Sequence, residues 1–166
     1  MLRLPSRKLQ GLRQVDSPAT QRYDWVMLPD FDSLGNMPPG IHDTTLAEVE
    51  ARFAYNKERR VLFSALKKVV SILTECKCPE VFLDGSFITT KADPADYDLC
   101  YEPTGIIATD RLQSFLSSSD TRKEEYLGDI FVRLPQPPYF IDHVENWQTD
   151  TRQDDARKGV LRIVLS

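Results

Sequence analysis

The stretch FLDGSFITTKADPADYDLC, residues 82–100, constrains the fold most strongly because two short apolar segments flank a polar connection. The first segment, VFLD, ends directly before Gly85 and Ser86. The second, DYDLCY, begins after a nine-residue spacer and alternates acidic with apolar side chains. Short segments of this kind are typical of strands, and the alternation indicates a strand with one buried face. The chain therefore predicts a sheet that carries two carboxylates on an open face.

Two helices are predicted ahead of these strands. In HDTTLAEVEARF, Thr45 and Glu48 have the spacing of a capping box, so a short helix should run to about Phe53. The segment NKERRVLFSALKKVVSILTEC, which Asn56 can cap, repeats apolar residues at three- and four-residue spacing and is the clearest helix. Its basic residues are interpreted as a solvated face; they are Arg59, Arg60, Lys67 and Lys68.

The remaining pattern predicts a mixed domain. A helix is expected over 109–119, a strand over 128–134, a short helix over 139–147 and a strand over 159–165. Helices followed by strands with helices interleaved indicate an α+β (mixed α/β) domain, in which helices pack on one face of a small mixed sheet.

The chain length of 166 residues suits one domain, which we place at residues 40–166. Residues 1–39 are broken by prolines and show no periodicity, so an extended N-terminal arm with one short ordered piece at 23–28 is predicted.

Composition excludes several classes of protein. A net charge of −4 gives no global signal for nucleic-acid binding. Three cysteines do not make a disulfide framework, and reduced thiols in or near the core are expected. A zinc site that combines them with His42 and His143 is disfavoured, because the usual paired-cysteine spacing is absent. No segment has the length of a membrane span and the N-terminus lacks a secretory apolar region, so a cytoplasmic protein without a membrane partner is predicted.

The two carboxylates suggest a metal site. Successive side chains of a strand point to opposite faces, so Asp96 and Asp98 share one face and lie roughly 6–7 Å apart along the backbone. Tyr97 and Leu99 then face the core. Mg²⁺ prefers oxygen ligands and is commonly held by one or two carboxylates together with water and phosphate oxygens.

Gly85 and Ser86 suggest a phosphate site. A glycine after a strand lets the backbone approach a ligand closely, and Ser86 can begin a helical turn whose N–H groups and hydroxyl bind phosphate. Taken alone, an Asp-x-Asp pair is also found as solvated charge and a Gly-Ser pair as an ordinary turn. The joint arrangement is rarer and indicates a nucleoside triphosphate site with Mg²⁺ or Mn²⁺.

This stretch resembles the signature of the nucleotidyltransferase superfamily, which includes DNA polymerase beta and the minimal nucleotidyltransferases of toxin–antitoxin pairs. The signature consists of Gly-Ser, a spacer, and Asp-apolar-Asp-apolar, here Gly85-Ser86 and Asp96-Tyr97-Asp98-Leu99. More widely, residues 37–166 resemble small bacterial and phage proteins that are classed as nucleotidyltransferase-like.

The resemblance implies roles for individual residues. Gly85 would form the turn, Ser86 would contact the nucleotide phosphates, and Asp96 and Asp98 would bind the metal. The superfamily usually adds a third carboxylate from a later strand, for which Asp129 is the first candidate, as metal ligand and general base, and Asp142 the second.

Two positions depart from the superfamily pattern. Asp84 occupies a position that is usually apolar, and it either adds an acidic group near the site or turns outward. The arginine that often follows Gly-Ser is missing, and Lys91 can take its place as a phosphate contact or stand as a solvated loop residue.

The leading functional hypothesis is an ATP- or other NTP-dependent nucleotidyltransferase, which moves a nucleoside monophosphate to a hydroxyl on a protein, an RNA end or a small molecule. The resemblance is compatible with a toxin–antitoxin or antiviral defence setting. The alternative is a catalytically silent binding module or antitoxin that holds a protein partner through the N-terminal arm. A third hypothesis is hydrolysis of a nucleotide or phosphodiester at the same metal site.

Overall fold

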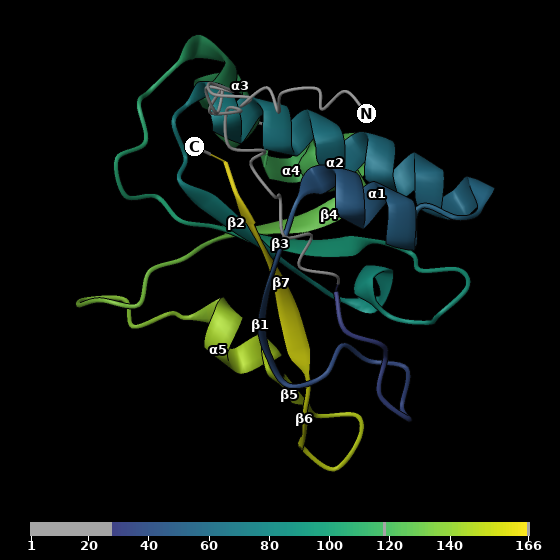
Figure 1. Ribbon diagram of the computed structural model, residues 1–166. Coiled ribbons are helices and arrows are strands. Elements are labelled where there is room, and N and C mark those ends of the chain that lie inside the picture. The colour runs from purple at the N-terminus through teal and green to yellow at the C-terminus, as the bar shows by residue number, and fades with distance from the viewer. Residues whose placement is uncertain (1–27, 118, 166) are drawn as a thin grey trace, which may run out of the picture.

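A five-stranded mixed sheet forms the centre of the computed structural model, which describes residues 28–117 and 119–165 (Figure 1). Its strand order is β1-β7-β2-β3-β4. The strands are β1 (Gly40–Thr44), β7 (Gly159–Val164), β2 (Glu80–Asp84), β3 (Tyr97–Tyr101) and β4 (Gly128–Val132). Strand β2 runs antiparallel to both of its neighbours, whereas β1 is parallel to β7 and β3 is parallel to β4. The predicted mixed α/β class is confirmed.

The two predicted N-terminal helices begin where their capping residues indicated. Helix α1 (Leu46–Phe53) starts after Thr45, which forms the complete capping box with Glu48. Helix α2 (Lys57–Glu75) starts after Asn56, whose side chain accepts a hydrogen bond from the Arg59 N–H. Both caps satisfy donors that the first helical turn cannot bond internally.

Among the described residues, four α-helices lie on one face of the sheet. Helices α1 and α2 are joined there by α3 (Asp110–Ser117) and α4 (Ser119–Tyr126), and Figure 1 shows all four on the same side. The main core fills the space between this helical layer and the sheet, and it contains Leu66, Leu83 and Leu99, all 0% exposed. Burial of these side chains is the main force that holds the layers together.

The opposite face carries a smaller layer. Helix α5 (His143–Trp147) and a hairpin of β5 (Thr149–Asp150) and β6 (Ala156–Arg157) lie below the sheet in Figure 1. Val144 of α5 packs with a second buried cluster that contains Phe82, Cys100 and Val160. The expected one-sided helical layer therefore describes α1 to α4, while α5 begins later than predicted and covers the other face.

The interpretation of Arg59 as a solvated residue is wrong. Its side chain is 0% exposed, although Arg60, Lys67 and Lys68 on the same helix are exposed as predicted. The helical pattern alone could not identify this difference, because the groups that surround Arg59 come from a loop about thirty residues later.

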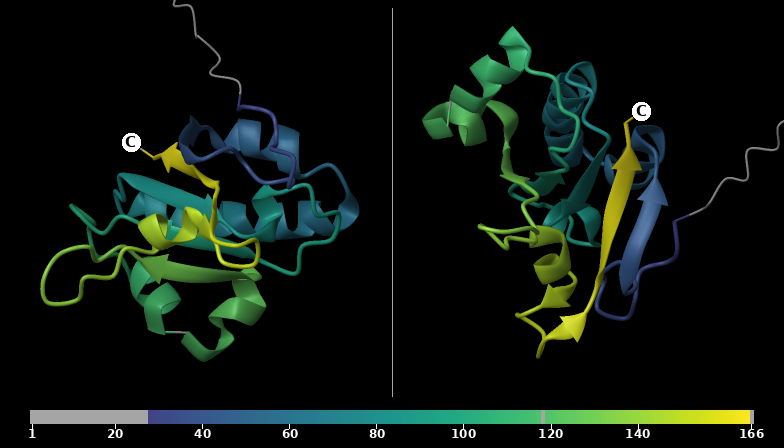
Figure 2. Two further views of the ribbon diagram at one scale, coloured as in Figure 1. Left: turned by 90° about the horizontal axis from the view of Figure 1, so that it is seen from below. Right: turned by 90° about the vertical axis from the view of Figure 1, so that its left-hand side faces the viewer.

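Several elements were not predicted. Strand β1 is only five residues long and reads GIHDT, which lacks a clear apolar alternation. It exists because it pairs with β7 from the other end of the chain, and the right-hand view of Figure 2 shows the two strands side by side. Helix α4 is strongly polar and rests against α2 and β4. Local sequence gives little indication of either element, since tertiary contacts stabilise both.

The end of the predicted arm is in contact with the domain. Met37 is 1% exposed, and its carbonyl accepts a hydrogen bond from the Gly159 N–H at 2.8 Å. The ordered piece predicted at 23–28 lies almost wholly outside the described residues.

The three cysteines are buried free thiols, as predicted. Within residues 28–117 and 119–165, no helix combines the length and apolar character that crossing a membrane requires.

Candidate functional site

Three aspartates form a row across adjacent strands at one end of the sheet. Strand pairing places Asp84 of β2 opposite Asp98 of β3, and Asp98 opposite Asp129 of β4. Residues paired across neighbouring strands have side chains on the same face, about 5 Å apart at Cβ. The structure therefore brings Asp98 and the predicted third carboxylate Asp129 together.

Asp96 reaches the same group from the residue before β3. Its carboxylate and that of Asp129 both contact Lys123 of α4, at 3.1 Å and 2.6 Å from Nζ. These two hydrogen bonds raise the pKa of Lys123, which keeps its ammonium charged. Lys123 thus supplies a positive charge between two of the three predicted metal ligands.

The Gly85 turn fits the close approach that the sequence indicated. Gly85 has a φ of 82°, a conformation that favours glycine. A Cβ at this position would lie 2.2 Å from Oδ2 of Asp98, so only a residue without a side chain leaves room for that carboxylate. The predicted helical turn follows directly as η1 (Ser86–Ile88), a 3-10 helix.

The side chain of Arg59 hydrogen-bonds to the backbone of the segment that follows Gly85. Its guanidinium donates hydrogen bonds to the carbonyls of Phe87 at 2.6 Å and Thr89 at 2.9 Å, and it also bonds the carbonyls of Phe53, Ser86 and Lys91. These carbonyls belong to the end of α1, to η1 and to the loop that follows η1, so one guanidinium group satisfies several acceptors at once. The position of Ser86 and Lys91 therefore depends on Arg59.

Asp84 turns inward rather than outward. It is 5% exposed, and both of its carboxylate oxygens accept hydrogen bonds from Nζ of Lys158 at 2.6 Å. Burial raises the pKa of Asp84, and the nearby ammonium of Lys158 opposes that rise. The acidic residue at a usually apolar position is thus accommodated by a lysine that the chain provides just before β7.

Asp98 experiences strong electrostatic repulsion from the rest of the group. Burial, followed by the charges of Asp84, Asp96 and Asp129, raises its pKa to about 6. An arriving cation would relieve this repulsion, because it favours the charged form of every carboxylate near it. Clusters of carboxylates with raised pKa values are common at functional sites.

A pocket of about 510 Å³ opens beside the Gly85 turn. Its wall includes Gly85, Ser86 and Asp98, which the sequence assigned to nucleotide and metal binding, and also the side of the loop that carries Lys91. Lys158 and Arg152 add two further cations. Asp84, Asp98 and Asp150 line the same pocket and balance the charge of its three cations. The volume suits a small-molecule ligand, since such pockets span roughly 300–1,000 Å³.

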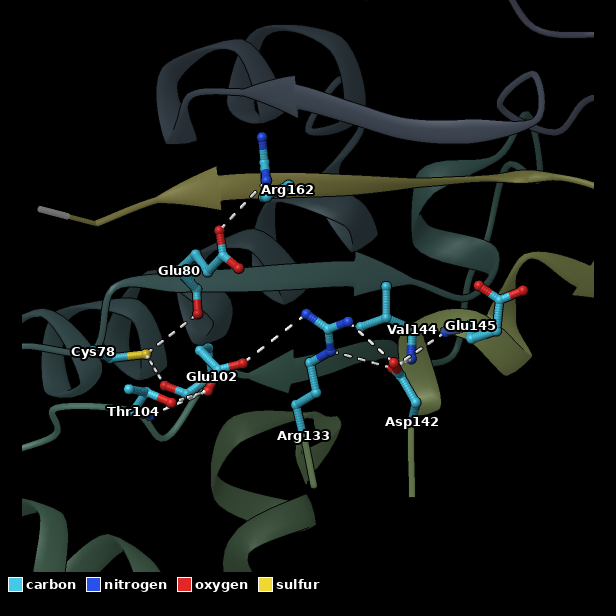
Figure 3. Close-up of polar contacts among 9 residues, drawn as sticks. All are labelled: Cys78, Glu80, Glu102, Thr104, Arg133, Asp142, Val144, Glu145 and Arg162. Atoms are coloured by element: carbon cyan, nitrogen blue, oxygen red, sulfur yellow. Dashed lines mark hydrogen bonds and ion pairs between the residues drawn. The ribbon is translucent and has the colours of Figure 1, made fainter. Parts of the chain in front are cut away.

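Asp142, the second candidate for the third carboxylate, lies elsewhere. It caps α5 by accepting hydrogen bonds from the N–H groups of Val144 and Glu145, and it pairs with Arg133 at 3.0 Å (Figure 3). Arg133 also approaches Glu102, so Asp142 belongs to a separate polar network on the face of α5.

The carboxylates of Asp96, Asp98 and Asp129 fit a cation that is also bound by water and substrate phosphates. In the described part of the chain, no three His, Cys, Asp or Glu side chains already stand close enough to enclose a metal ion. Mg²⁺ seldom uses such an enclosure and is instead held by one or two carboxylates together with water and substrate phosphates. Asp98 with Asp96 or Asp129 offers this set, on condition that Lys123 moves aside or binds the phosphates.

Sequence reasoning missed four cations near the site, namely Lys123, Lys158, Arg152 and Arg59. Lys158 stands 74 positions from its partner Asp84, and no local pattern connects the two. Arg59 and Lys123 lie in helices, where a basic residue ordinarily indicates solvent.

Residues 29–164 match the model of a family of unknown function, DUF6932. No curated protein matches the chain. No solved structure matches it either.

Proposed function

We propose that this chain, which belongs to the DUF6932 family of unknown function, is a metal-dependent nucleotidyltransferase. The reaction would move a nucleoside monophosphate from an NTP to an acceptor hydroxyl on a protein, an RNA end or a small molecule, with Mg²⁺ or Mn²⁺ as the cofactor. The observation that carries the proposal is the alignment of Asp98 with Asp129 beside the Gly85 turn, next to a polar pocket whose wall includes Asp98 and Ser86.

The phosphates would bind along the Gly85–Ser86 turn. Free N–H groups at such a turn attract anions, and the Ser86 hydroxyl adds a further donor. Lys91 and Arg152 of the pocket wall would offset part of the negative charge of a triphosphate, whereas Lys158 is already paired with Asp84. The turn and the cations together would orient the α-phosphate toward Asp98.

The chemical step is a substitution at phosphorus. The acceptor oxygen forms a bond to the α-phosphorus, the bond from that phosphorus to the bridging oxygen of pyrophosphate breaks, and pyrophosphate leaves. The hydroxyl proton passes to a carboxylate, a role that we assign to Asp129 because it adjoins Asp98 and lies partly exposed. A bound Mg²⁺ would supply charge neutralisation on the phosphates.

The proposal is tested by label transfer. The protein is incubated with each α-labelled NTP, Mg²⁺ or Mn²⁺, and cell extract, beside an Asp96→Ala/Asp98→Ala variant. We expect label in a macromolecule or small product with the wild type alone. Asp142→Asn is the matched control, because it removes a carboxylate outside the row and should leave transfer intact. Absence of both transfer and metal-dependent NTP binding would refute the proposal.

The contact of Lys123 with Asp96 and Asp129 favours the alternative function, a catalytically silent binding module. A lysine that permanently neutralises Asp96 and Asp129 would exclude the metal. A Lys123→Met variant separates the two functions. If Lys123 only blocks the site, the variant gains Mg²⁺-dependent NTP binding that the wild type lacks. If the site is active, the wild type binds NTP and Lys123→Met changes the affinity several-fold at most.

A further inference from the structure

The helical face of the molecule carries a strip of basic side chains. On α2 the exposed cations are Lys57, Arg60, Lys67 and Lys68, and α3 adds Arg111. We call these five residues the basic strip. They border two shallow depressions of about 390 Å³ and 360 Å³ on the surface between α2 and its neighbours α3 and α4.

The charge of the basic strip opposes that of the whole chain. The protein has a net charge of −4, yet among the described residues the linings of the two depressions hold five cations and one carboxylate. Glu125 borders the first depression, and Glu75 forms an ion pair with Arg111. Such a local reversal of charge on an acidic protein is the electrostatic footprint of a polyanionic partner.

Exposed hydroxyls alternate with the cations. Ser64 borders both depressions and donates its hydroxyl hydrogen to the Arg60 carbonyl at 2.9 Å, which leaves its oxygen as an acceptor. Ser71 stands beside Arg111, which donates a hydrogen bond to its oxygen at 3.4 Å. Phosphate oxygens accept hydrogen bonds from the lysine and arginine side chains of the strip. Hydroxyl groups can also pair with the 2′-hydroxyl that distinguishes RNA from DNA.

The strip runs toward the carboxylates of the site. Its first depression is bordered by Leu127, two residues before Asp129, and α4, which carries Lys123, lies alongside. At the same end of α2, Asn56 donates a hydrogen bond to the Ala92 carbonyl in the loop that follows Lys91. Helix α2 has 19 residues and is therefore about 28 Å long, enough to contact several consecutive phosphates.

We propose that the basic strip is a docking surface for an RNA strand, and that this strand presents the acceptor hydroxyl to the site. The inference rests on the proposed function for the role of the RNA, whereas RNA binding itself can be measured alone. It narrows the acceptor from a protein, an RNA end or a small molecule to an RNA end.

The test measures binding of a labelled single-stranded RNA of about twelve nucleotides by fluorescence anisotropy at several KCl concentrations. We expect the logarithm of the affinity to fall with the logarithm of salt concentration, with a slope of about −0.7 for each phosphate contacted. Lys68→Glu should weaken binding at least fivefold, and Arg60→Glu/Lys68→Glu should weaken it further and flatten the slope. Arg157→Glu makes the same change of charge in β6, on the other face of the sheet, and should change RNA affinity less than twofold.

Binding of the Mg²⁺–NTP complex is measured on the same variants. Unchanged NTP binding in Arg60→Glu/Lys68→Glu, with RNA binding lost, supports the inference and shows that the variant is folded. RNA affinity that Lys68→Glu and Arg157→Glu reduce equally would overturn it, and so would equal affinity for DNA of the same sequence. Label transfer to a protein that the strip variants leave unchanged would overturn it as well. A wild type that binds RNA but no NTP would refute the proposed function alone.

Discussion

Nζ of Lys158 lies 2.6 Å from both carboxylate oxygens of Asp84, in a contact that joins the start of β7 to the end of β2. The exposed fractions of the two side chains are 14% and 7%, so water contributes little to the solvation of either charge. The pair stands directly before Gly85 and borders the pocket. Its integrity therefore affects both the fold and the site.

Lys158→Met should lower the free energy of unfolding by about 3 kcal/mol, because it leaves the buried carboxylate of Asp84 without its partner. Urea denaturation at pH 7.5 measures the loss. Asp84→Leu/Lys158→Met should recover most of the stability, since neither charge remains to be desolvated. Mg²⁺–NTP binding should stay weak in the double variant, because the pocket still lacks the cation. A loss below about 1 kcal/mol in the single variant would show that the pair is solvated.

Arg59→Met should destabilise the protein by about 3 kcal/mol, because several buried carbonyls of the loop around Thr89 lose their donor. The neighbouring variant Arg60→Met is the matched control, since Arg60 is exposed and should change stability by no more than about 0.5 kcal/mol. Thermal unfolding gives the stability, and hydrogen exchange reports on the loop. Equal stability losses in the two variants would contradict the assigned role of Arg59.

Gly85→Ala should abolish metal-dependent activity and cost about 2 kcal/mol, because the new Cβ would meet Oδ2 of Asp98 at 2.2 Å in a backbone conformation that alanine disfavours. Gly105→Ala is the control for a positive φ alone. Gly105 has a similar φ of 79°, but no atom of the described residues beyond its chain neighbours stands within 4 Å of the position that a Cβ would take there. The stability lost at Gly85 beyond that lost at Gly105, measured by denaturation, combines the steric overlap with Asp98 and the cost of the extended ψ of −175° at Gly85.

The raised pKa of Asp98, about 6, predicts a specific pH dependence. Between pH 4 and 6 the folded protein holds a proton that the unfolded chain has already released, so this group makes stability fall as the pH rises through that window. Above pH 6 the free energy of unfolding that is lost by ionising Asp98 stays constant, at about 1.5 kcal/mol after screening by solvent.

Asp98→Asn should remove this cost and make the protein without metal more stable at pH 7.5 than the wild type, as thermal unfolding across pH 4–8 can establish. In the wild type, Mg²⁺–NTP binding should weaken below about pH 6, because a protonated Asp98 is a poor metal ligand. Equal stability of wild type and variant at every pH would contradict the electrostatic account of the aspartate row.

Local sequence determined the parts of this protein that depend on neighbouring residues. The caps at Thr45 and Asn56, the apolar periodicity of α2, and the alternation in β3 each involve contacts within a few positions. The same holds for the turn at Gly85, where glycine alone tolerates the conformation at no cost. These signals were sufficient to predict the mixed α/β class, and they singled out Gly85, Asp96 and Asp98 as candidate site residues, which stays a prediction.

Tertiary structure alone decided how those residues meet. The row of aspartates depends on the register of β2, β3 and β4, which no single strand specifies. Pairing of Lys158 with Asp84, burial of Arg59 and the contact of Lys123 with Asp96 join segments that are far apart in the chain. Whether a charged side chain meets solvent or a partner depends on what packs around it, and that is a property of the folded whole rather than of any short stretch.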